Sequence, residues 1–176
     1  QDVEMVLELG ATMVRTAHYQ HRQRFYELAD ERGLVVWTET PVNGTITGGS
    51  TPSGSSFLNA SKQQLREVIR QNANHASIAA WGLFNELADN STSRSVITAL
   101  QTVAKEEDTT RPTTAATWST SMRTLDRIPD TIGFNRYYGW KLGSPSDWSA
   151  FLDQLRKDNP TRAIAVSEYG GGANVG

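Results

Sequence analysis

Apolar and polar positions alternate along the chain in a way that predicts helices and strands in turn. Amphipathic helices, whose apolar residues recur every three or four positions, are predicted at residues 2–9, 22–32, 59–73, 93–107 and 144–158. Short strands that are apolar on both faces are predicted at residues 11–16, 34–39, 77–85, 113–117, 131–136 and 163–168. Strands of this kind belong to parallel sheets covered by helices, so the pattern predicts an α/β fold.

Two connections depart from this regular alternation. Residues 45–56 are rich in Gly, Ser and Thr and predict a loop. Residues 122–128 offer barely two helical turns between the fourth and fifth strands. The six strands fit either an incomplete (β/α) barrel or an open doubly wound sheet.

Polar and aromatic side chains at the ends of the strands favour the barrel. They are Arg15, His18, Tyr19, Glu39, Asn85, Glu86, Trp118, Asn135, Tyr137, Tyr138, Trp140, Glu168 and Tyr169. A (β/α) barrel builds its site from the carboxyl ends of several strands, whereas a doubly wound sheet gathers its ligand groups at one switch point. Carboxylates and amides bind hydroxyl groups and aromatic rings stack on sugar rings, so this set suits a carbohydrate.

Glu86 and Glu168 each close a strand that is otherwise apolar. Burying a lone carboxylate is costly, so an acid at such a position is usually kept for chemistry. Two carboxylates on different strands are the minimum needed to hydrolyse a glycosidic bond. Other candidate residues also have structural interpretations, because Glu39 can pair with Arg15, His18 can cap a loop, and His75 can satisfy backbone groups before the third strand.

The composition narrows the possible partners. The net charge is −2 and no segment reaches the length of a membrane span, so neither nucleic acid nor a membrane is an expected partner. The chain has no cysteine, which excludes disulfides and thiolate metal sites. It begins with Gln1 rather than Met, so we expect a piece of a longer protein.

Four segments together resemble glycoside hydrolase family 2. Residues 81–86 read Trp-Gly-Leu-Phe-Asn-Glu, with Asn74-His75 upstream, and are similar to the acid/base motif of that family. Segments 10–19, 135–140 and 167–170 complete the match in the family's order. The resemblance covers essentially the whole chain and implies a TIM-barrel catalytic domain with a retaining mechanism.

The resemblance also implies roles for particular side chains. Glu86 matches the general acid/base and Glu168 the nucleophile, which requires carboxyl groups about 5–5.5 Å apart. The candidate substrate-binding residues are His18, Glu39, His75, Asn85, Tyr137 and Trp140. Among them, Asn85 matches the group that binds the sugar 2-hydroxyl, Tyr137 a tyrosine that touches the nucleophile, and Trp140 an aromatic wall.

Within the family, the chain is most similar to bacterial β-galactosidases, through residues 17–21, 83–87 and 167–174. The leading prediction is a retaining β-galactosidase that hydrolyses terminal β-D-galactosides by double displacement, in a bacterial cytoplasm or periplasm. A β-glucuronidase of the same family is the alternative, because the motif at residues 135–140 occurs in both. A catalytically weak carbohydrate-binding fragment and an inert structural fragment are further hypotheses.

Some details depart from the family. Some β-galactosidases hold magnesium through an acid and a His shortly after the strand that ends here at Glu39, but residues 41–45 read Pro-Val-Asn-Gly-Thr, so neither a metal nor a cofactor is predicted. Some members have a His where this chain has Gly171. Glucuronidases recognise the sugar carboxylate through an Asn-Lys pair beyond the nucleophile, which we expect past residue 176.

In barrel terms, residues 2–9 are the first helix and the last predicted strand is the seventh. Strands 2 to 7 are therefore expected within residues 1–176 as a partial catalytic domain, without the first and eighth strands or the flanking sandwich domains. Six strands leave two unpaired edges. We expect a chain that is marginally stable alone, forms a homo-oligomer through those edges, or belongs to a larger protein.

Overall fold

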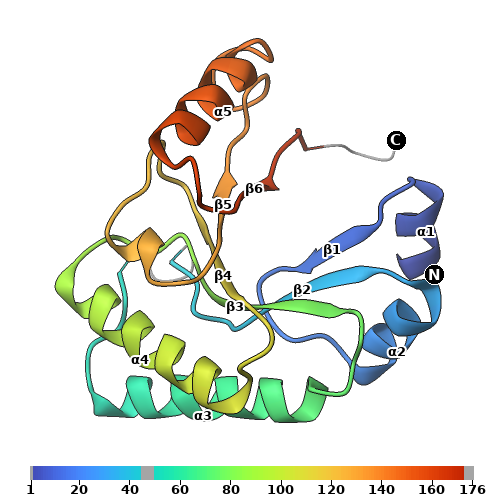
Figure 1. The fold of residues 1–176 in the computed structure, drawn as a ribbon, viewed down its shortest axis with the longest axis vertical. Coiled ribbons are helices and arrows are strands. Elements are labelled where there is room, and N and C mark those ends of the chain that lie inside the picture. The colour runs from blue at the N-terminus through green and yellow to red at the C-terminus, as the bar shows by residue number, and fades with distance from the viewer. Residues whose placement is uncertain (1, 45–49, 173–176) are drawn as a thin grey trace.

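Six parallel strands form one curved sheet in which neighbours in the chain are neighbours in space (Figure 1). They are β1 (Met13–Thr16), β2 (Val35–Glu39), β3 (Ile78–Asn85), β4 (Thr113–Thr117), β5 (Ile132–Asn135) and β6 (Ile164–Glu168). The computed structural model describes residues 2–44 and 50–172. The consecutive strand order confirms the predicted incomplete barrel, because a doubly wound sheet reverses its order at a switch point.

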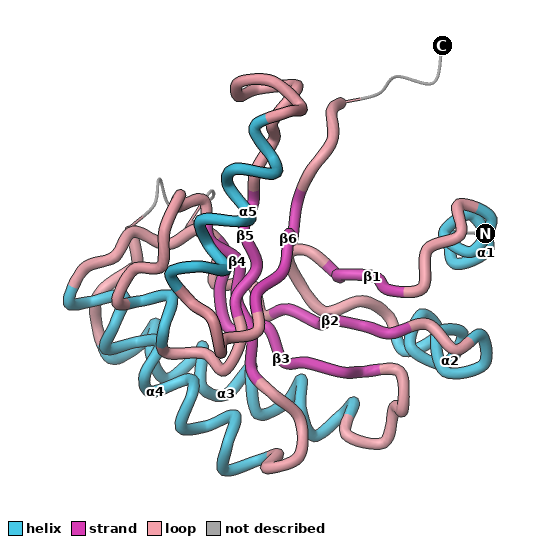
Figure 2. The backbone as a smooth tube through the Cα atoms, turned by 45° about the horizontal axis from the view of Figure 1, so that its top comes forward, coloured by secondary structure: helices cyan, strands magenta, loops and turns pink. Residues whose placement is uncertain are grey.

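Helices connect most of the strands in the described residues. They are α1 (Asp2–Glu8), α2 (Gln23–Arg32), α3 (Ser55–Asn72), α4 (Ser91–Glu107) and α5 (Asp147–Asp158), with a short 3-10 helix η1 (Leu125–Arg127) before β5. Figures 1 and 2 show α3 and α4 side by side along one side of the sheet, and Figure 1 shows α5 at the opposite end of the molecule.

Most predicted segments are present, with shifted ends. Helix α3 begins at Ser55 rather than at residue 59, because Phe57 and Leu58 continue the apolar face that packs on the core. Of the loop predicted at residues 45–56, residues 45–49 lie outside the described part of the chain. Helix α5 begins at Asp147, three residues later than predicted. The Oδ2 of Asp147 accepts a hydrogen bond of 2.7 Å from the backbone N–H of Ser144.

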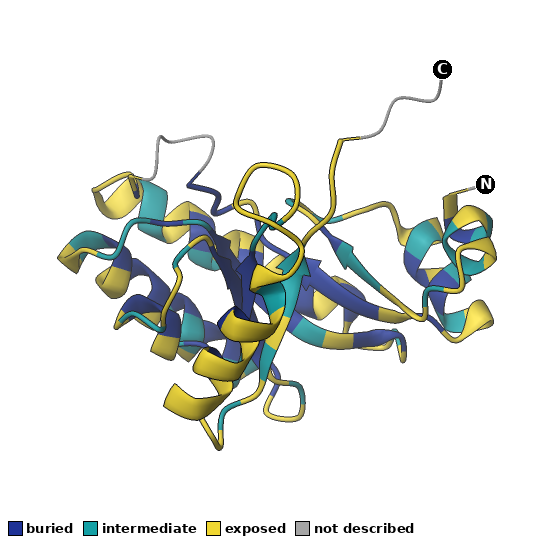
Figure 3. Ribbon diagram, turned by 90° about the horizontal axis from the view of Figure 1, so that it is seen from above, coloured by how far each residue is buried: buried dark blue, intermediate teal, exposed yellow. Residues whose placement is uncertain are grey.

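The apolar core lies between the sheet and the helices, and Figure 3 shows that most of the buried residues are there. Leu65 and Ile69 of α3 and Ile97 and Leu100 of α4 are fully buried there. On β2, Thr38 points to this side, because its Oγ1 lies 3.0 Å from the Tyr26 hydroxyl of α2. Side chains alternate along a strand, so the residues on either side of Thr38 point to the inner, concave face of the sheet.

Two glycines make room for a tryptophan on that concave face. Trp37 is 4% exposed and fills the interior. A Cβ atom at Gly82 would lie 2.7 Å from its Nε1, and a Cβ at Gly133 would lie 2.8 Å from its ring edge. Only a residue without a side chain fits at either position, so β3 and β5 close around the indole.

Strands β1 and β6 are the two edges of the sheet in the described residues. Near the amino ends of the strands, Met13 and Val35 are 50% and 41% exposed, as expected of an interior that further strands would cover. Homo-oligomer formation through these edges stays a prediction. No helix within residues 2–44 and 50–172 has both the length and the apolar character to cross a membrane.

Asp108, at the amino end of the strands, is a buried carboxylate with several donors. It accepts hydrogen bonds from Trp81 Nε1 at 3.0 Å, from Arg111 Nη1 at 2.9 Å and from the backbone and hydroxyl of Thr110 at 2.8 and 2.6 Å. Burial alone would raise the pKa of Asp108, but these hydrogen bonds outweigh it and hold the pKa well below its ordinary value. The ionised carboxylate therefore ties β3 to the turn before β4.

Replacing Asp108 by Asn should lower the free energy of unfolding at pH 7 by about 2–3 kcal/mol, because a charged acceptor of several hydrogen bonds is lost. Since the pKa of Asp108 is lower in the folded than in the unfolded state, its contribution is present above about pH 4 and is lost as the pH falls toward the folded-state pKa. Urea unfolding between pH 7 and pH 2 measures both effects. Glu106→Gln, at an exposed neighbour, is the control; an equal loss in both variants would contradict the assignment.

Candidate active site

The carboxyl ends of the strands bring the two predicted catalytic glutamates together. Glu168 is the last residue of β6, and Glu86 directly follows β3. Glu86 has a φ of +52°, the left-handed region that side chains rarely adopt. Its N–H donates to the carbonyl of Ala116 on β4 at 2.9 Å, and a Cβ at Gly44 would lie 2.0 Å from its carbonyl oxygen. Backbone contacts on two sides therefore hold Glu86 in its unusual conformation.

Arg15 of β1 contacts three other strands through separate nitrogens. Its Nε donates to Glu39, its Nη1 to Glu168 and its Nη2 to the Oδ1 of Asn85, each at 2.8 Å. Burial would lower the pKa of Arg15, but the charges and hydrogen bonds of the two carboxylates raise it above its ordinary value. The ion pair between Arg15 and Glu39, one of the two roles considered for Glu39 from the sequence, is present.

Asn135, the last residue of β5, joins the two glutamates. Its Nδ2 donates to Glu86 Oε1 at 2.8 Å and to Glu168 Oε1 at 3.0 Å. Because one nitrogen contacts both oxygens at 2.8 and 3.0 Å, the two oxygens lie less than about 6 Å apart. Ser167 orients the amide by donating from Oγ to Asn135 Oδ1 at 2.7 Å.

Tyr137 and Trp140 form an aromatic wall beside Glu168. The Tyr137 hydroxyl donates a hydrogen bond to Glu168 Oε2. Burial, together with the hydrogen bond to Glu168 and its charge, raises the pKa of Tyr137 above its ordinary value, so the hydroxyl keeps its proton at neutral pH. The Trp140 ring meets that of Tyr137 edge to face, with centroids 5.7 Å apart, and is half exposed.

His18 and Glu39 form a pair next to Arg15. The Nδ1 of His18 lies 3.0 Å from Glu39 Oε1, while Oε2 of the same carboxylate accepts from Arg15. The hydrogen bond from His18 to Glu39 raises the pKa of His18 above its ordinary value despite partial burial. Glu39 is 1% exposed with both oxygens engaged, so its place is beneath the site, where it positions Arg15 and His18.

The structure does not bring His75 to this site, which corrects the sequence-based prediction. His75 precedes the amino end of β3, where its Nδ1 lies 2.6 Å from Asp30 and its Nε2 lies 2.9 Å from Gln23. Glu86 follows the other end of this eight-residue strand, which is roughly 25 Å long at the usual rise of about 3.3 Å per residue. His75 therefore belongs to the framework that joins α2 to β3.

Three further residues contribute that were not among the candidate catalytic or substrate-binding residues, although Arg15 and Asn135 were among the polar residues noted at strand ends. Arg15 and Asn135 contact the glutamates directly, and Asn43 accepts from Asn85 Nδ2 at 3.2 Å through its Oδ1. Their position in the sequence could have identified two of these residues as site residues, because Arg15 and Asn135 both lie at or near the carboxyl ends of predicted strands. Residues 173 and 174 of the motif that follows Glu168 lie outside the described residues.

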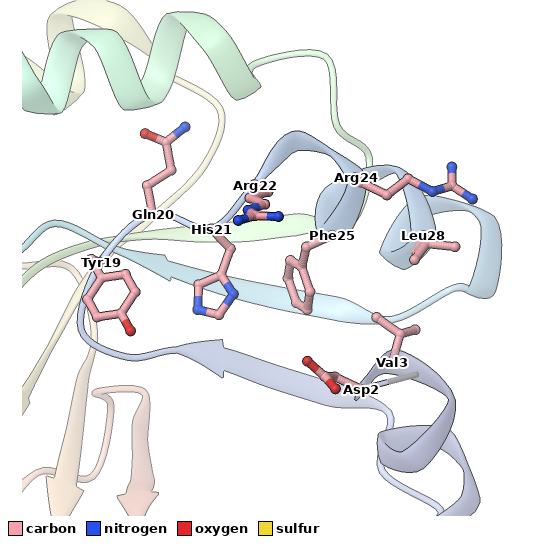
Figure 4. Close-up of a pocket in the computed structure, with 9 residues that line it drawn as sticks. All are labelled: Asp2, Val3, Tyr19, Gln20, His21, Arg22, Arg24, Phe25 and Leu28. Carbon is pink, nitrogen blue, oxygen red and sulfur yellow. The ribbon is translucent and has the colours of Figure 1, made fainter.

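A separate cavity of 470 Å³ lies between α1, α2 and the segment before α2 (Figure 4). It is lined by Asp2, Val3, Tyr19, Gln20, His21, Arg22, Arg24, Phe25 and Leu28. Neither Glu86 nor Glu168 lines it, so the cavity is distinct from the candidate active site. In the described residues, no group of three or more His, Asp or Glu side chains is arranged to hold a metal ion.

Several known proteins are similar to this chain along nearly its whole length. The β-glucuronidase of Bacteroides fragilis is 42% identical over 99% of the chain, and the β-galactosidase of Thermoanaerobacterium thermosulfurigenes is 30% identical over 93%. These matches span 25% and 21% of the two relatives, so the chain spans about a quarter of their length.

Solved structures share the fold. An FMN-binding β-glucuronidase from Facaelibacterium prausnitzii L2-6 superposes with a TM-score of 0.90 at 34% identity, covering 99% of this chain and 27% of that one. A putative β-galactosidase from Bacteroides fragilis gives a TM-score of 0.89 at 34% identity, covering 98% of this chain and 25% of that one. The model of the family described as glycosyl hydrolases family 2, TIM barrel domain, matches residues 1–176, and the chain belongs to this family.

Proposed function

We propose that the chain is the catalytic barrel of a retaining β-glycosidase. The observation that carries this proposal is the single amide nitrogen of Asn135 that contacts both Glu86 and Glu168, which keeps their nearest oxygens less than about 6 Å apart. Retaining enzymes place their carboxyl groups about 5–5.5 Å apart, whereas inverting enzymes need about 6.5–9.5 Å to admit a water molecule. The short separation favours attack by a carboxylate over attack by water.

The hydrogen bonds support different roles for the two glutamates. Glu168 accepts from Arg15, Asn135 and Tyr137, and such donors stabilise an ionised carboxylate that can attack the anomeric carbon. Glu86 accepts from Asn135 alone among the described side chains, so one oxygen is open to protonate the leaving group. Bond formation neutralises Glu168, after which Glu86 accepts a proton from the attacking water and the sugar is released.

The neighbouring residues supply the sugar contacts in this proposal. His18 offers a polar ring to sugar hydroxyls. The family resemblance assigns the 2-hydroxyl to Asn85, whose buried amide also contacts Arg15, Asn135 and Asn43. Tyr137 and Trp140 offer ring surfaces to the apolar face of the sugar. Glu39 acts by positioning, and His75 is left out of the site.

We propose a β-glucuronide as the first candidate substrate and a β-galactoside as the second. The similarity to a 42% identical β-glucuronidase supports the first. The similarity to a 30% identical β-galactosidase supports the second, which was the leading prediction from the sequence. Hydrolysis of nitrophenyl β-glucuronide beside nitrophenyl β-galactoside, by the gene product that contains residues 1–176, separates the two.

Replacing Glu168 by Gln should reduce kcat by at least about 10³-fold on every substrate, because the nucleophile is lost. Replacing Glu86 by Gln should cost less with nitrophenyl glycosides than with alkyl glycosides, since nitrophenolate leaves without a proton. Proton NMR of the first product should show the β-anomer. An α-anomer formed first, or full activity of the Glu168 variant, would overturn the mechanism; Glu106→Gln is the exposed control.

Replacing Glu39 by Gln should lower the pKa of His18 toward its ordinary value of 6.5, because the hydrogen bond to a charged carboxylate raises it. The ring protons of His18 report this pKa in an NMR titration from pH 5 to pH 9. Glu107→Gln, on the far side of the sheet at the end of α4, serves as the matched control. If His18 titrates identically in the Glu39→Gln and Glu107→Gln variants, Glu39 does not raise the pKa of His18.

A further inference from the structure

Trp37 lies directly beside Arg15 on the inner face of the sheet. The two residues are register partners on β2 and β1, so their side chains leave the sheet on the same face. The Cζ of Arg15 lies 5.1 Å from the centroid of the indole, within the range of cation–π attraction. Trp37 is buried and the side chain of Arg15 is 8% exposed, and such an attraction is stronger away from water. The indole therefore limits where the guanidinium can lie.

The far edge of the same indole meets Ser167. A Cβ at Gly133, on β5, would lie 2.8 Å from Cη2 of the ring and 2.6 Å from the Oγ of Ser167. The indole and the serine therefore confine one another across this glycine. In the part of the chain that the structure describes, Nε1 of Trp37 has no hydrogen-bond partner. The contribution of Trp37 therefore comes from the contacts of its ring.

Both neighbours of the indole lead to one oxygen atom of the proposed nucleophile. Arg15 donates from Nη1 to Glu168 Oε1 at 2.8 Å. Ser167 donates to the Oδ1 of Asn135, and Nδ2 of the same amide donates to Glu168 Oε1 at 3.0 Å. The other oxygen, Oε2, accepts from Tyr137. The indole thus contacts one donor of Oε1 directly and the other through a single serine.

We propose that Trp37 is a positioning residue for the nucleophile, because its ring keeps the two donors of Glu168 Oε1 in place. This inference rests on the proposed function and deepens it. A carboxylate attacks the anomeric carbon efficiently only when it is held in line with that carbon, and a displacement of about 1 Å can cost about 10²-fold in rate. Loss of the ring should therefore slow the reaction more than it weakens the binding of the sugar.

The test compares Trp37→Leu, which removes the aromatic face, with Trp37→Phe, which keeps a smaller one. Trp81→Leu is the matched control, because Trp81 is also buried and also lies against an arginine, with Arg111 Cζ 5.5 Å from its ring. All three are made in the gene product that contains residues 1–176. The amount of folded protein is measured by near-UV circular dichroism, and kcat and KM are measured with the preferred nitrophenyl glycoside.

Per folded molecule, kcat should fall about 10- to 100-fold in Trp37→Leu, with a much smaller change in KM. It should fall less in Trp37→Phe and stay near the wild-type value in Trp81→Leu. An unchanged kcat in Trp37→Leu, or an equal loss in the control, would overturn the proposal, because the indole would then only fill the core. If Trp37→Leu does not fold, Trp37→Phe against Trp81→Phe gives the same comparison.

A double-mutant cycle with Arg15→Lys asks whether Trp37 acts through its neighbour. If it does, the loss of kcat in the double variant should be smaller than the product of the two single losses, because residues that act together are not additive. Losses that multiply, or exceed the product, would contradict the proposal.

Crystal structures of the wild-type and Trp37→Leu proteins separate this inference from the proposed function. If the wild type hydrolyses neither nitrophenyl glycoside, the proposed function fails. A variant structure in which Arg15 or the Asn135 amide has moved away from Glu168 Oε1 would still support the positioning role of Trp37. A structure in which both hydrogen bonds are kept would show that the indole does not position them.

Discussion

The buried guanidinium of Arg15 is the interaction on which the site depends. An arginine cannot lose its proton in a protein, and a charge taken out of water needs anions and acceptors around it. Glu39, Asn85 and Glu168 supply them from β2, β3 and β6, one on each of three nitrogens. Since β1 and β6 are the opposite edges of the sheet in the described residues, their bond requires the sheet to curve. The hydrogen bonds of Arg15 therefore both neutralise its buried charge and hold the sheet in its curved shape.

The two ends of the strands have separate tasks. At the amino end, Asp108 and the pair of Asp30 with His75 link strands to helices and turns. At the carboxyl end, Glu86 and Glu168 face one another across the amide of Asn135. This division is the one expected of a (β/α) barrel, in which the chemistry lies at the carboxyl ends. It also explains why a histidine close in sequence to the acid/base motif lies far from the chemistry.

The hydrophobic pattern was enough to predict the strands and the helices, because each element buries one continuous apolar surface, and the polar residues at the strand ends then favoured the barrel over a doubly wound sheet. Position at a strand end was enough to single out Glu86 and Glu168. The bridging role of Asn135 was not predictable in the same way. The strand register shifts between Phe134 and Asn135 and again between Gly82 and Asn85, next to the two amides that contact the glutamates or Arg15. A sequence pattern with a period of two contains no information about such shifts.

The close packing around Trp37 limits which substitutions the inner face of the sheet can accept. A side chain at Gly133 would collide with the indole and also with Ser167, whose Cβ would lie 2.5 Å away. An alanine at this position therefore fits only after both neighbours have shifted or become smaller. Ser167 also orients the amide of Asn135 through a 2.7 Å hydrogen bond. Replacing this serine to make room would also remove the hydrogen bond that orients the Asn135 amide, so the packing of the interior and the contacts of Glu86 and Glu168 cannot change independently.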